Sequence, residues 1–456
     1  MNIDFSLIAK YDRSGPRYTS YPTAPHFHEG FTADDFRREI ARTNAEAGAP
    51  PLSLYVHLPF CESVCFFCGC NVTFTSDRRR PIAYTESLVG EMDAVAALVD
   101  RRRRVEQLHW GGGTPTFFRP EQMRALHEAT RARFEFALDA EVGIEVDPRE
   151  ASEEHFATLA ALGFNRLSMG VQDFDPRVQK AVNRIQTEEI TRRAIAQARA
   201  VGFASVSLDL IYGLPHQTEA TFAATVAKVL ALDPDRVAVF NFAYLPEIVR
   251  HQKAIPREAL PSPAEKLAIL RRASEDFAAA GYRYVGMDHF AKPTDELCRA
   301  QDAGQLTRNF QGYSTHGGCD LYAFGVSAIS QVGRAYAQNH KSVHLYEPKA
   351  RAGELATQRG ILLTPEDELR REVILRLMCD FRLDTAAFGK RHGIAFGEHF
   401  AEALEALVPM ERDGLLTVRG DTIDVTPTGR YLIRNICMAF DARLAEKPGH
   451  KFSRTV

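Results

Sequence analysis

The sequence Cys61-Glu-Ser-Val-Cys65-Phe-Phe-Cys68-Gly-Cys70 places four of the eight cysteines of this chain in one short loop. It directly follows the apolar run Leu52-Ser-Leu-Tyr-Val-His-Leu-Pro-Phe60, which has the length and composition of a buried strand. Thiols gathered in one loop indicate a metal centre or redox chemistry, in a compartment that keeps cysteines reduced.

Three explanations of this cysteine loop can be compared. A structural zinc site takes four ligands, but they usually form two short clips separated by a longer segment, which is absent here. Inert buried packing does not account for four thiols so close together. The spacing Cys61-x3-Cys65-x2-Cys68 suits a [4Fe–4S] cluster, which is large enough for one loop to wrap and has an open fourth iron when three thiolates bind it. Cys70 then lies outside the cluster, and the sequence does not define its role.

Length, charge and hydropathy limit the possible locations and partners. The chain has 456 residues, 45% of them hydrophobic, which is enough for two domains. Its net charge of −3 gives no general attraction to nucleic acid. The N-terminus is partly acidic, and no segment approaches the roughly 18 apolar residues of a membrane span. We therefore expect a cytoplasmic protein with no membrane span and no nucleic-acid partner.

Short apolar runs alternate with helical patterns after residue 50. This alternation predicts a parallel sheet of six βα units, arranged either as an open doubly wound sheet or as an incomplete barrel. Periodicity alone does not separate these two α/β architectures. The expected strands are 52–57, 105–110, 142–146, 166–171, 206–211 and 237–242, and the expected helices are 84–99, 120–133, 152–162, 187–200 and 218–231.

The pattern also predicts four segments. Residues 1–50 form an N-terminal extension, and residues 51–290 form the domain that contains the βα units and the cysteine loop. Residues 291–360 show little periodicity, and we expect a linker and substrate-site loops there. Residues 361–456 are expected to form a helical domain with a two-stranded wing near 414–426, similar to a winged helix. Because this domain is not basic, DNA binding is disfavoured.

Further motifs follow other strands. Trp110-Gly-Gly-Gly-Thr-Pro115 alone would be a tight turn, but beside the cysteine loop it suggests close approach of the backbone to a ligand. Glu145, Gln172 and Asp209 lie at or near the carboxyl ends of strands, where such folds place their sites. Asp209 is a charge in an apolar strand and needs a polar partner, either a ligand or an arginine such as Arg184.

The cysteine spacing after a first strand resembles the radical S-adenosylmethionine (SAM) superfamily. Further segments narrow the resemblance to the oxygen-independent coproporphyrinogen III oxidase family, and they extend over essentially the whole chain. This resemblance implies a monomer with a six-unit partial (β/α) barrel, an N-terminal extension and a helical, winged-helix-like C-terminal domain. The segments that carry it include 16–24, 109–115, 144–148, 165–174, 209–215 and 309–313.

The resemblance also implies the cofactors. Cys61, Cys65 and Cys68 would bind one [4Fe–4S] cluster, and two SAM molecules would be bound. In this superfamily SAM chelates the open iron, and an electron from the cluster, supplied by a low-potential donor, cleaves SAM to a 5′-deoxyadenosyl radical. No catalytic side chain is implied beyond these cofactors. The implied SAM contacts are Tyr55, Phe67, Gly112, Gly113, Thr114, Glu145, Gln172, Arg184, Asp209, Ala243 and Ile329.

The implied reaction converts two propionates of coproporphyrinogen III to vinyl groups, giving protoporphyrinogen IX and carbon dioxide. The C–H bond involved is beyond the reach of any side-chain base, whereas an alkyl radical can abstract the hydrogen. The anionic substrate requires cationic partners, for which Arg17 and Arg308 are candidates. One alternative is the related haem-chaperone branch, a binding protein that keeps the cluster without this reaction. The other is a redox-sensing winged-helix regulator, which would need a basic face.

Overall fold

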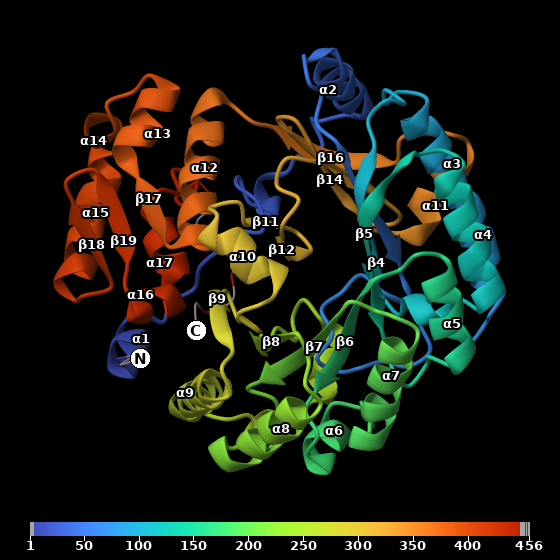
Figure 1. Cartoon of the computed structure of the whole chain (residues 1–456), viewed down its shortest axis with the longest axis horizontal. Coiled ribbons are helices and arrows are strands. Elements are labelled where there is room, and N and C mark those ends of the chain that lie inside the picture. The colour runs from blue at the N-terminus through green and yellow to red at the C-terminus, as the bar shows by residue number, and fades with distance from the viewer. Residues whose placement is uncertain (1–3, 447–451, 453, 455–456) are drawn as a thin grey trace.

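The computed structural model describes residues 4–446, 452 and 454, and a curved sheet forms its centre (Figure 1). All six predicted strands are confirmed, and they run parallel in the predicted order. They are β1 (Leu52–Leu58), β4 (Val105–Gly112), β5 (Phe136–Val146), β6 (Arg166–Gln172), β7 (Ser205–Tyr212) and β8 (Arg236–Asn241). The helices between them are α3 (Arg80–Ala96), α4 (Pro120–Arg131), α5 (Glu153–Ala161), α6 (Pro176–Ala181), α7 (Glu188–Ala200) and α8 (Glu219–Ala231).

These helices cover the outer face of the parallel strands, which is the arrangement of a partial barrel (Figure 1). The sheet has twelve strands in the order β16-β15-β14-β13-β1-β4-β5-β6-β7-β8-β10-β9, and its two ends do not pair with each other in the described part of the chain. The incomplete barrel is therefore confirmed, and the doubly wound alternative is excluded. The short α6 was not predicted.

Side-chain alternation along the strands separates the core from the site. Trp110 and Ile144 are fully buried beneath the outer helices, and the Trp110 ring packs 4.8 Å from that of Phe164. The neighbouring residues His109 and Glu145 point to the opposite face, because successive side chains of a strand alternate. The interior of the barrel thus receives polar groups from strands whose outer face is apolar.

Residues 291–360 are regular structure, so the expectation that they form a linker of loops is wrong. β13 pairs in parallel with β1 and continues the sheet, and antiparallel strands follow it. The sequence pattern is weak because polar side chains are buried there in hydrogen bonds; for example, Asn339 donates to the carboxylate of Glu91 at 2.6 Å. Two antiparallel strands, β9 (Arg283–Gly286) and β10 (His289–Ala291), precede this segment. The elements that follow are α10 (Glu296–Asp302), β11 (Thr307–Asn309), β12 (Gly312–Ser314), β13 (Asp320–Phe324), β14 (Ile329–Val332), β15 (Ala335–Asn339), α11 (Val343–Arg351) and β16 (Thr357–Leu362).

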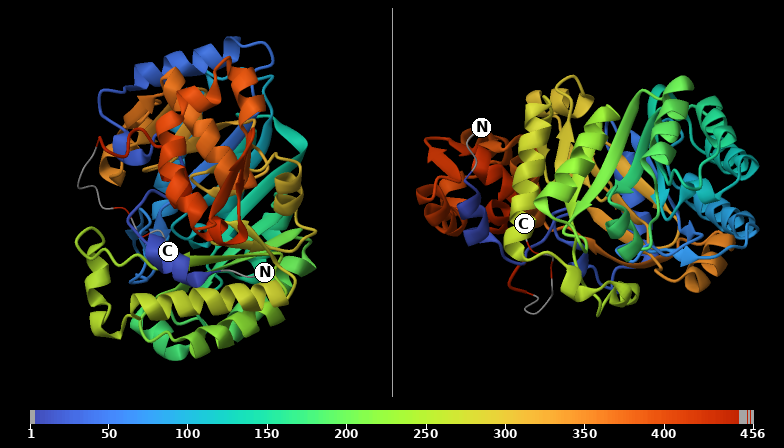
Figure 2. Two further views of the ribbon diagram at one scale, coloured as in Figure 1. Left: turned by 90° about the vertical axis from the view of Figure 1, so that its left-hand side faces the viewer. Right: turned by 90° about the horizontal axis from the view of Figure 1, so that it is seen from below.

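The C-terminal domain is helical, as predicted, and it lies beside the barrel (Figure 2). Two strands within residues 416–425 form the predicted wing, and a third strand at residues 382–384, which was not predicted, pairs with them. The N-terminal extension divides: α2 (Ala33–Ala45) contacts β14 and β15, whereas α1 (Phe5–Tyr11) packs against α9 (Pro263–Ala279) and α16 (Pro427–Tyr431). The other elements of the domain are α12 (Pro365–Asp380), β17 (Arg382–Asp384), α13 (Thr385–His392), α14 (Phe396–His399), α15 (Ala401–Arg412), β18 (Leu416–Arg419), β19 (Thr422–Val425) and α17 (Ile433–Met438). No helix in the described ranges is long and apolar enough to cross a membrane.

Candidate functional site

The cysteine loop is held at its base by two short strands, β2 (Phe60–Cys61) and β3 (Thr73–Phe74). Its flanks are also fixed: the backbone N–H of Phe66 donates to the carbonyl of Val182 at 2.9 Å, and His251 bonds the carbonyl of Cys68 at 2.6 Å. Because backbone groups supply these contacts, the thiols of the loop are left available to bind a ligand.

Two cationic side chains lie beside the sulfur of Cys65. A nitrogen of Arg184 lies 3.5 Å from its sulfur and a nitrogen of Arg149 lies 3.6 Å away. Both arginines also bond the buried carboxylate of Asp147, at 3.0 Å and 2.7 Å, which fixes their positions. Cations beside a thiol stabilise its ionised form. Burial acts in the opposite direction at Cys61 and raises the pKa of that thiol to about 12.

Cys70, which the sequence left without a role, lies next to Cys68. The hydrogen bond from the Cys70 thiol to the Cys68 sulfur lowers the pKa of Cys68. Such a hydrogen bond stabilises the ionised form of the sulfur that accepts it. The structure thus places Cys70 beside the third cysteine of the Cys61-x3-Cys65-x2-Cys68 spacing.

The glycine run at the end of β4 permits close contacts. A side chain at Gly111 would meet the carboxylate of Glu145 at 2.8 Å, and one at Gly113 would meet the backbone of Pro59 at 2.6 Å. Gly112 has a φ of +112°, and its N–H donates to the Glu145 carboxylate at 3.0 Å. The glycines therefore bring the ends of β1, β4 and β5 together around one carboxylate.

The pKa values of Glu145 and Asp209 are shifted in opposite directions. Although burial opposes ionisation of Glu145, hydrogen bonding from His109 and from the Gly112 N–H lowers its pKa. Burial and the nearby charge of Glu145 raise the pKa of Asp209 to about 7. Asp209 accepts a hydrogen bond from Ser168 at 3.2 Å, whereas Arg184 pairs with Asp147 instead of with Asp209. Arg184 is thus near enough to attract Asp209, but its ion pair is with Asp147.

Two buried polar atoms of this site have no hydrogen-bond partner among the described residues: Oε1 of Gln172 and Nε of Arg184. Gln172 ends β6 with a φ of +68°, in the left-handed region that non-glycine residues seldom adopt. Buried polar groups are normally paired, so a bound ligand is a reasonable partner for these two atoms.

Most of the predicted site residues line one cavity of about 250 Å³ at the carboxyl ends of the parallel strands. Three predicted residues do not line it. The hydroxyl of Tyr55 bonds His57 at 3.1 Å, Ala243 lines a neighbouring cavity, and Ile329 begins β14. The residues that share the cavity are Cys61, Cys65, Phe67, Cys68, Gly112, Gly113, Thr114, Glu145, Gln172, Arg184 and Asp209.

Sequence reasoning missed several residues that support this site. Asp147 and Arg149 follow Glu145 at the end of β5, and Ser168 is paired with Glu145 across β5 and β6. Position was the available signal for Asp147 and Arg149, because both follow the carboxyl end of a predicted strand. Ser168 is the third residue of β6 and offered no such signal. His57 and His109 belonged to the motifs considered, but they carried no assigned role.

The arrangement of thiols fits an iron–sulfur cluster better than a single metal ion. A single metal ion needs ligand atoms that lie close together. Among the described residues, three such atoms from His, Cys, Asp or Glu side chains lie within 4.8 Å of one another at Glu106, His316 and Cys319, but the thiols of the cysteine loop do not form such a group. A cluster binds each thiolate to a different iron, so its ligands are spread more widely than those of one zinc ion. The residues present therefore fit the group that the spacing predicted.

Comparison with known proteins agrees with this geometry. The family model of the radical SAM superfamily matches residues 55–229, and that of the HemN C-terminal domain matches residues 363–432. The fold and the site thus define a radical SAM enzyme, whose cofactors are a [4Fe–4S] cluster and SAM.

Similarity over the full length gives the family. The chain is 50% identical over 455 residues to the oxygen-independent coproporphyrinogen III oxidase of Pseudomonas aeruginosa, covering 99% of this chain and 98% of the relative. It is 48% identical over 454 residues to the Escherichia coli K12 protein of the same name, with the same coverage. The solved coproporphyrinogen III oxidase (HemN) from Escherichia coli matches with a TM-score of 0.92 and 47% identity, over 97% of this chain and 100% of that chain. The chain belongs to the oxygen-independent coproporphyrinogen III oxidase family.

Proposed function

We infer that this chain decarboxylates two propionates of coproporphyrinogen III to vinyl groups, giving protoporphyrinogen IX without oxygen. The observation that carries the inference is the cavity in which three thiols face the polar ends of β4 to β7, in a chain about half identical to enzymes of this name. When bound, the cluster and SAM supply an electron and a carbon-centred radical able to take hydrogen from an unactivated C–H bond.

The chain's own residues bind and orient these groups. Cys61, Cys65 and Cys68 hold the cluster, and Arg149 and Arg184 offset the charge of the thiolates. Two features support this assignment: the thiols of the loop are spread more widely than the ligands of one metal ion, and hydrogen bonds to Val182 and His251 hold the loop in place. A cluster bound by one preorganised loop loses little conformational entropy on assembly.

The carboxylates have separate tasks in SAM binding. Glu145 faces the cavity, with 46% of its side-chain surface accessible, and its lowered pKa suits it to bind the SAM ammonium group. Asp209 and Gln172, deeper along β7 and β6, suit the ribose hydroxyls, which can both donate and accept hydrogen bonds. A second SAM molecule would contact Ala243 and Ile329, outside the thiol cavity.

The substrate carboxylates require cations, and Arg308 is placed for this purpose. It lines a cavity of about 620 Å³ between the barrel and α12, and its Nε and Nη1 are buried with no hydrogen-bond partner among the described residues. An unpaired buried charge is costly, so an anionic ligand is its natural partner. Arg17 pairs with Asp288 at 2.5 Å and forms the wall of a second cavity, which also includes Ala243.

Further parts of the proposal concern organisation. Residues 51–290 would form the catalytic domain, the strands within 291–360 would line the substrate site, and 361–456 would close its open side. The protein would act as a cytoplasmic monomer and receive electrons from a low-potential donor.

The test is an anaerobic assay of the reconstituted enzyme with SAM, a reductant and coproporphyrinogen III. We expect both 5′-deoxyadenosine and the divinyl product. If 5′-deoxyadenosine forms without a vinyl product, the decarboxylase proposal fails, and a haem-chaperone function becomes the better explanation. If neither forms in a protein that carries its iron, the radical chemistry itself is refuted.

A further inference from the structure

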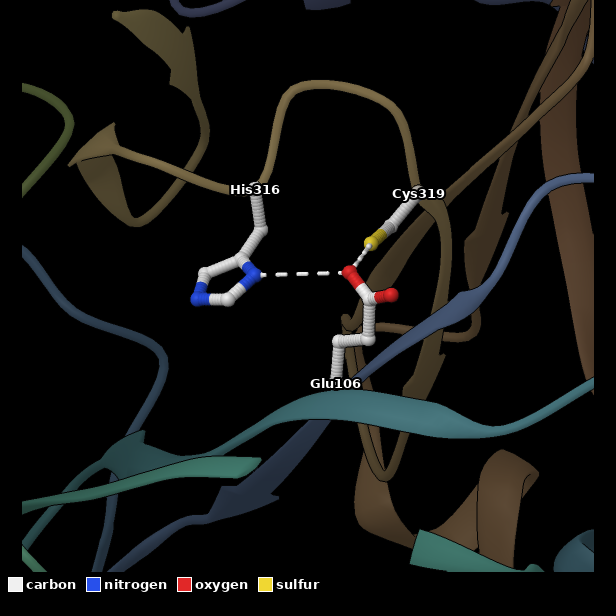
Figure 3. A group of neighbouring side chains, drawn as sticks. All are labelled: Glu106, His316 and Cys319. Atoms are coloured by element: carbon white, nitrogen blue, oxygen red, sulfur yellow. Dashed lines mark hydrogen bonds and ion pairs between the residues drawn. The ribbon is translucent and has the colours of Figure 1, made fainter. Parts of the chain in front are cut away.

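A second group of metal-ligand side chains lies at the opposite edge of the sheet from the thiol cavity. Figure 3 shows Glu106, near the start of β4, with its carboxylate directed toward His316 and Cys319. Oε2 of Glu106 is 3.7 Å from the Cys319 sulfur and 3.8 Å from Nδ1 of His316. All three ligand atoms lie within 4.8 Å of one another.

The turn that carries two of these side chains is built to hold them together. His316 and Cys319 are separated by Gly317 and Gly318, and the Cys319 N–H donates to the His316 carbonyl at 3.4 Å. A side chain at Gly317 would meet Thr307 at 2.9 Å, so the turn can pass close to β11 only with glycine there. Two ligands three residues apart form the short clip that is common in zinc sites.

The distances and the donor types together suit one ion. Bonds of about 2.0–2.3 Å in a tetrahedral site put ligand atoms about 3.3–3.7 Å apart, so the observed spacings need only a small contraction. A thiolate, an imidazole and a carboxylate select zinc over magnesium or calcium, which prefer oxygen ligands alone. We propose that Glu106, His316 and Cys319 bind one Zn²⁺ ion, with a water molecule as the fourth ligand.

The surroundings of His316 support this assignment. Its other ring nitrogen, Nε2, lies 3.8 Å from Oε2 of Glu141, and Gln107 donates to the other oxygen of that carboxylate at 2.7 Å. A carboxylate behind a ligating histidine orients the ring and increases its basicity. The simpler alternative is a protonated His316 paired with two carboxylates. However, both separations exceed hydrogen-bond length, which leaves room for an ion between His316 and Glu106.

The proposed site has a structural consequence. β13 and β4 are the two neighbours of β1 in the sheet, and the turn at 316–319 leads directly into β13. An ion shared by Glu106 and this turn would join the two neighbours of β1 at their amino-terminal ends. It would act apart from the cysteine loop, which follows the carboxyl end of β1.

The experiment uses untagged enzyme with its cluster already reconstituted, so that the thiols of the cysteine loop cannot capture zinc. The protein is equilibrated with one equivalent of zinc sulfate, desalted, and analysed for zinc and iron by mass spectrometry. We expect about one zinc per chain in the unmodified enzyme. In Cys319→Ser, His316→Asn and Glu106→Gln, zinc should fall by at least about tenfold with iron unchanged. Cys298→Ser, a buried thiol elsewhere, should retain zinc.

X-ray absorption at the zinc edge gives a second readout, with one sulfur neighbour expected in the unmodified enzyme. The proposal is overturned if the unmodified enzyme retains no zinc, or if all three variants retain it. Because Cys319 is partly buried, its variant could fail to fold, which its iron content would reveal. Glu106 is exposed, and Glu106→Gln then decides the question alone.

Discussion

Two parts of the molecule carry different chemistry. The parallel part, β1 and β4 to β8, presents thiols, glycines and carboxylates at its carboxyl edge, close to one cavity. The second part, residues 307–362, contains strands β13 to β16 of the sheet and the separate hairpin of β11 and β12, and we call it the antiparallel part. It holds a network of buried polar side chains and Arg308, whose Nε and Nη1 have no hydrogen-bond partner among the described residues. The contrast suggests that the parallel part binds the cofactors and that the antiparallel part contributes to substrate recognition.

The largest expected effect is in the parallel part. Cys68→Ser should abolish cluster iron and both products, because a [4Fe–4S] cluster needs its thiolate ligands. The matched control is Cys70→Ser in the same loop, which should retain iron because Cys70 contacts a ligand but is not one. Iron analysis and product chromatography make the measurement. Equal loss of iron in both variants would refute the assignment of three ligands.

A second substitution tests SAM binding at the same edge. Glu145→Gln should keep its iron but weaken SAM binding by about 10–100-fold, since a hydrogen bond to a charged group contributes about 1.5–3 kcal/mol. The dissociation constant for SAM is measured by equilibrium binding to the reconstituted protein. Glu121→Gln, an exposed carboxylate on α4, is the control. If the Glu145 variant binds SAM with unchanged affinity, Glu145 does not contact SAM.

The antiparallel part should respond differently. Arg308→Gln should raise the KM for coproporphyrinogen III by about 10–100-fold through loss of a charge-assisted hydrogen bond. SAM cleavage without substrate should be unchanged, because Arg308 lies outside the thiol cavity. Arg101→Gln, on the exposed turn before β4, serves as the control. A KM equal to that of the unmodified enzyme would break the proposed division of roles.

At the junction of the two parts the expected effect is on stability alone. Glu91 of α3 is buried and accepts hydrogen bonds from Tyr346 at 2.6 Å, from Asn339 and from the Gly325 N–H, and burial raises its pKa to about 7. Because this pKa is higher in the folded state than in the unfolded state, its contribution to stability is complete below about pH 4.5. The contribution is lost as the pH rises through about 7, by on the order of 3 kcal/mol.

Thermal unfolding of the cluster-loaded protein at pH 5 and pH 8 tests this junction. The decrease in stability between these pH values should be smaller in Glu91→Gln than in the unmodified enzyme. An identical decrease in both proteins would show that Glu91 does not titrate as the geometry suggests.

The two parts also differ in how well the sequence predicts them. The strands of the parallel part bury one apolar face under helices, so runs such as 52–57 and 105–110 are visible in the sequence. The cysteine spacing and the strand-end residues Glu145, Gln172 and Asp209 then locate the site. Asp147 and Arg149 could not be assigned, because their role depends on the neighbouring Cys65 and Arg184, which come from other loops.

The antiparallel part escaped prediction for a physical reason. Ser330, Gln338 and Asn339 lie in β14 and β15 and are buried, so these strands do not alternate between apolar and polar residues. Their polar groups are satisfied by distant partners, such as Glu91 for Asn339 and Arg359 for Gln338. Only the folded chain brings these partners together.

The most direct test of the central claim follows a hydrogen atom. Coproporphyrinogen III deuterated at the ring-adjacent propionate carbons would be incubated anaerobically with the reconstituted enzyme, SAM and a reductant. The radical account predicts a divinyl product and deuterium in the methyl group of 5′-deoxyadenosine, as detected by mass spectrometry. Formation of the divinyl product with unlabelled 5′-deoxyadenosine would contradict it.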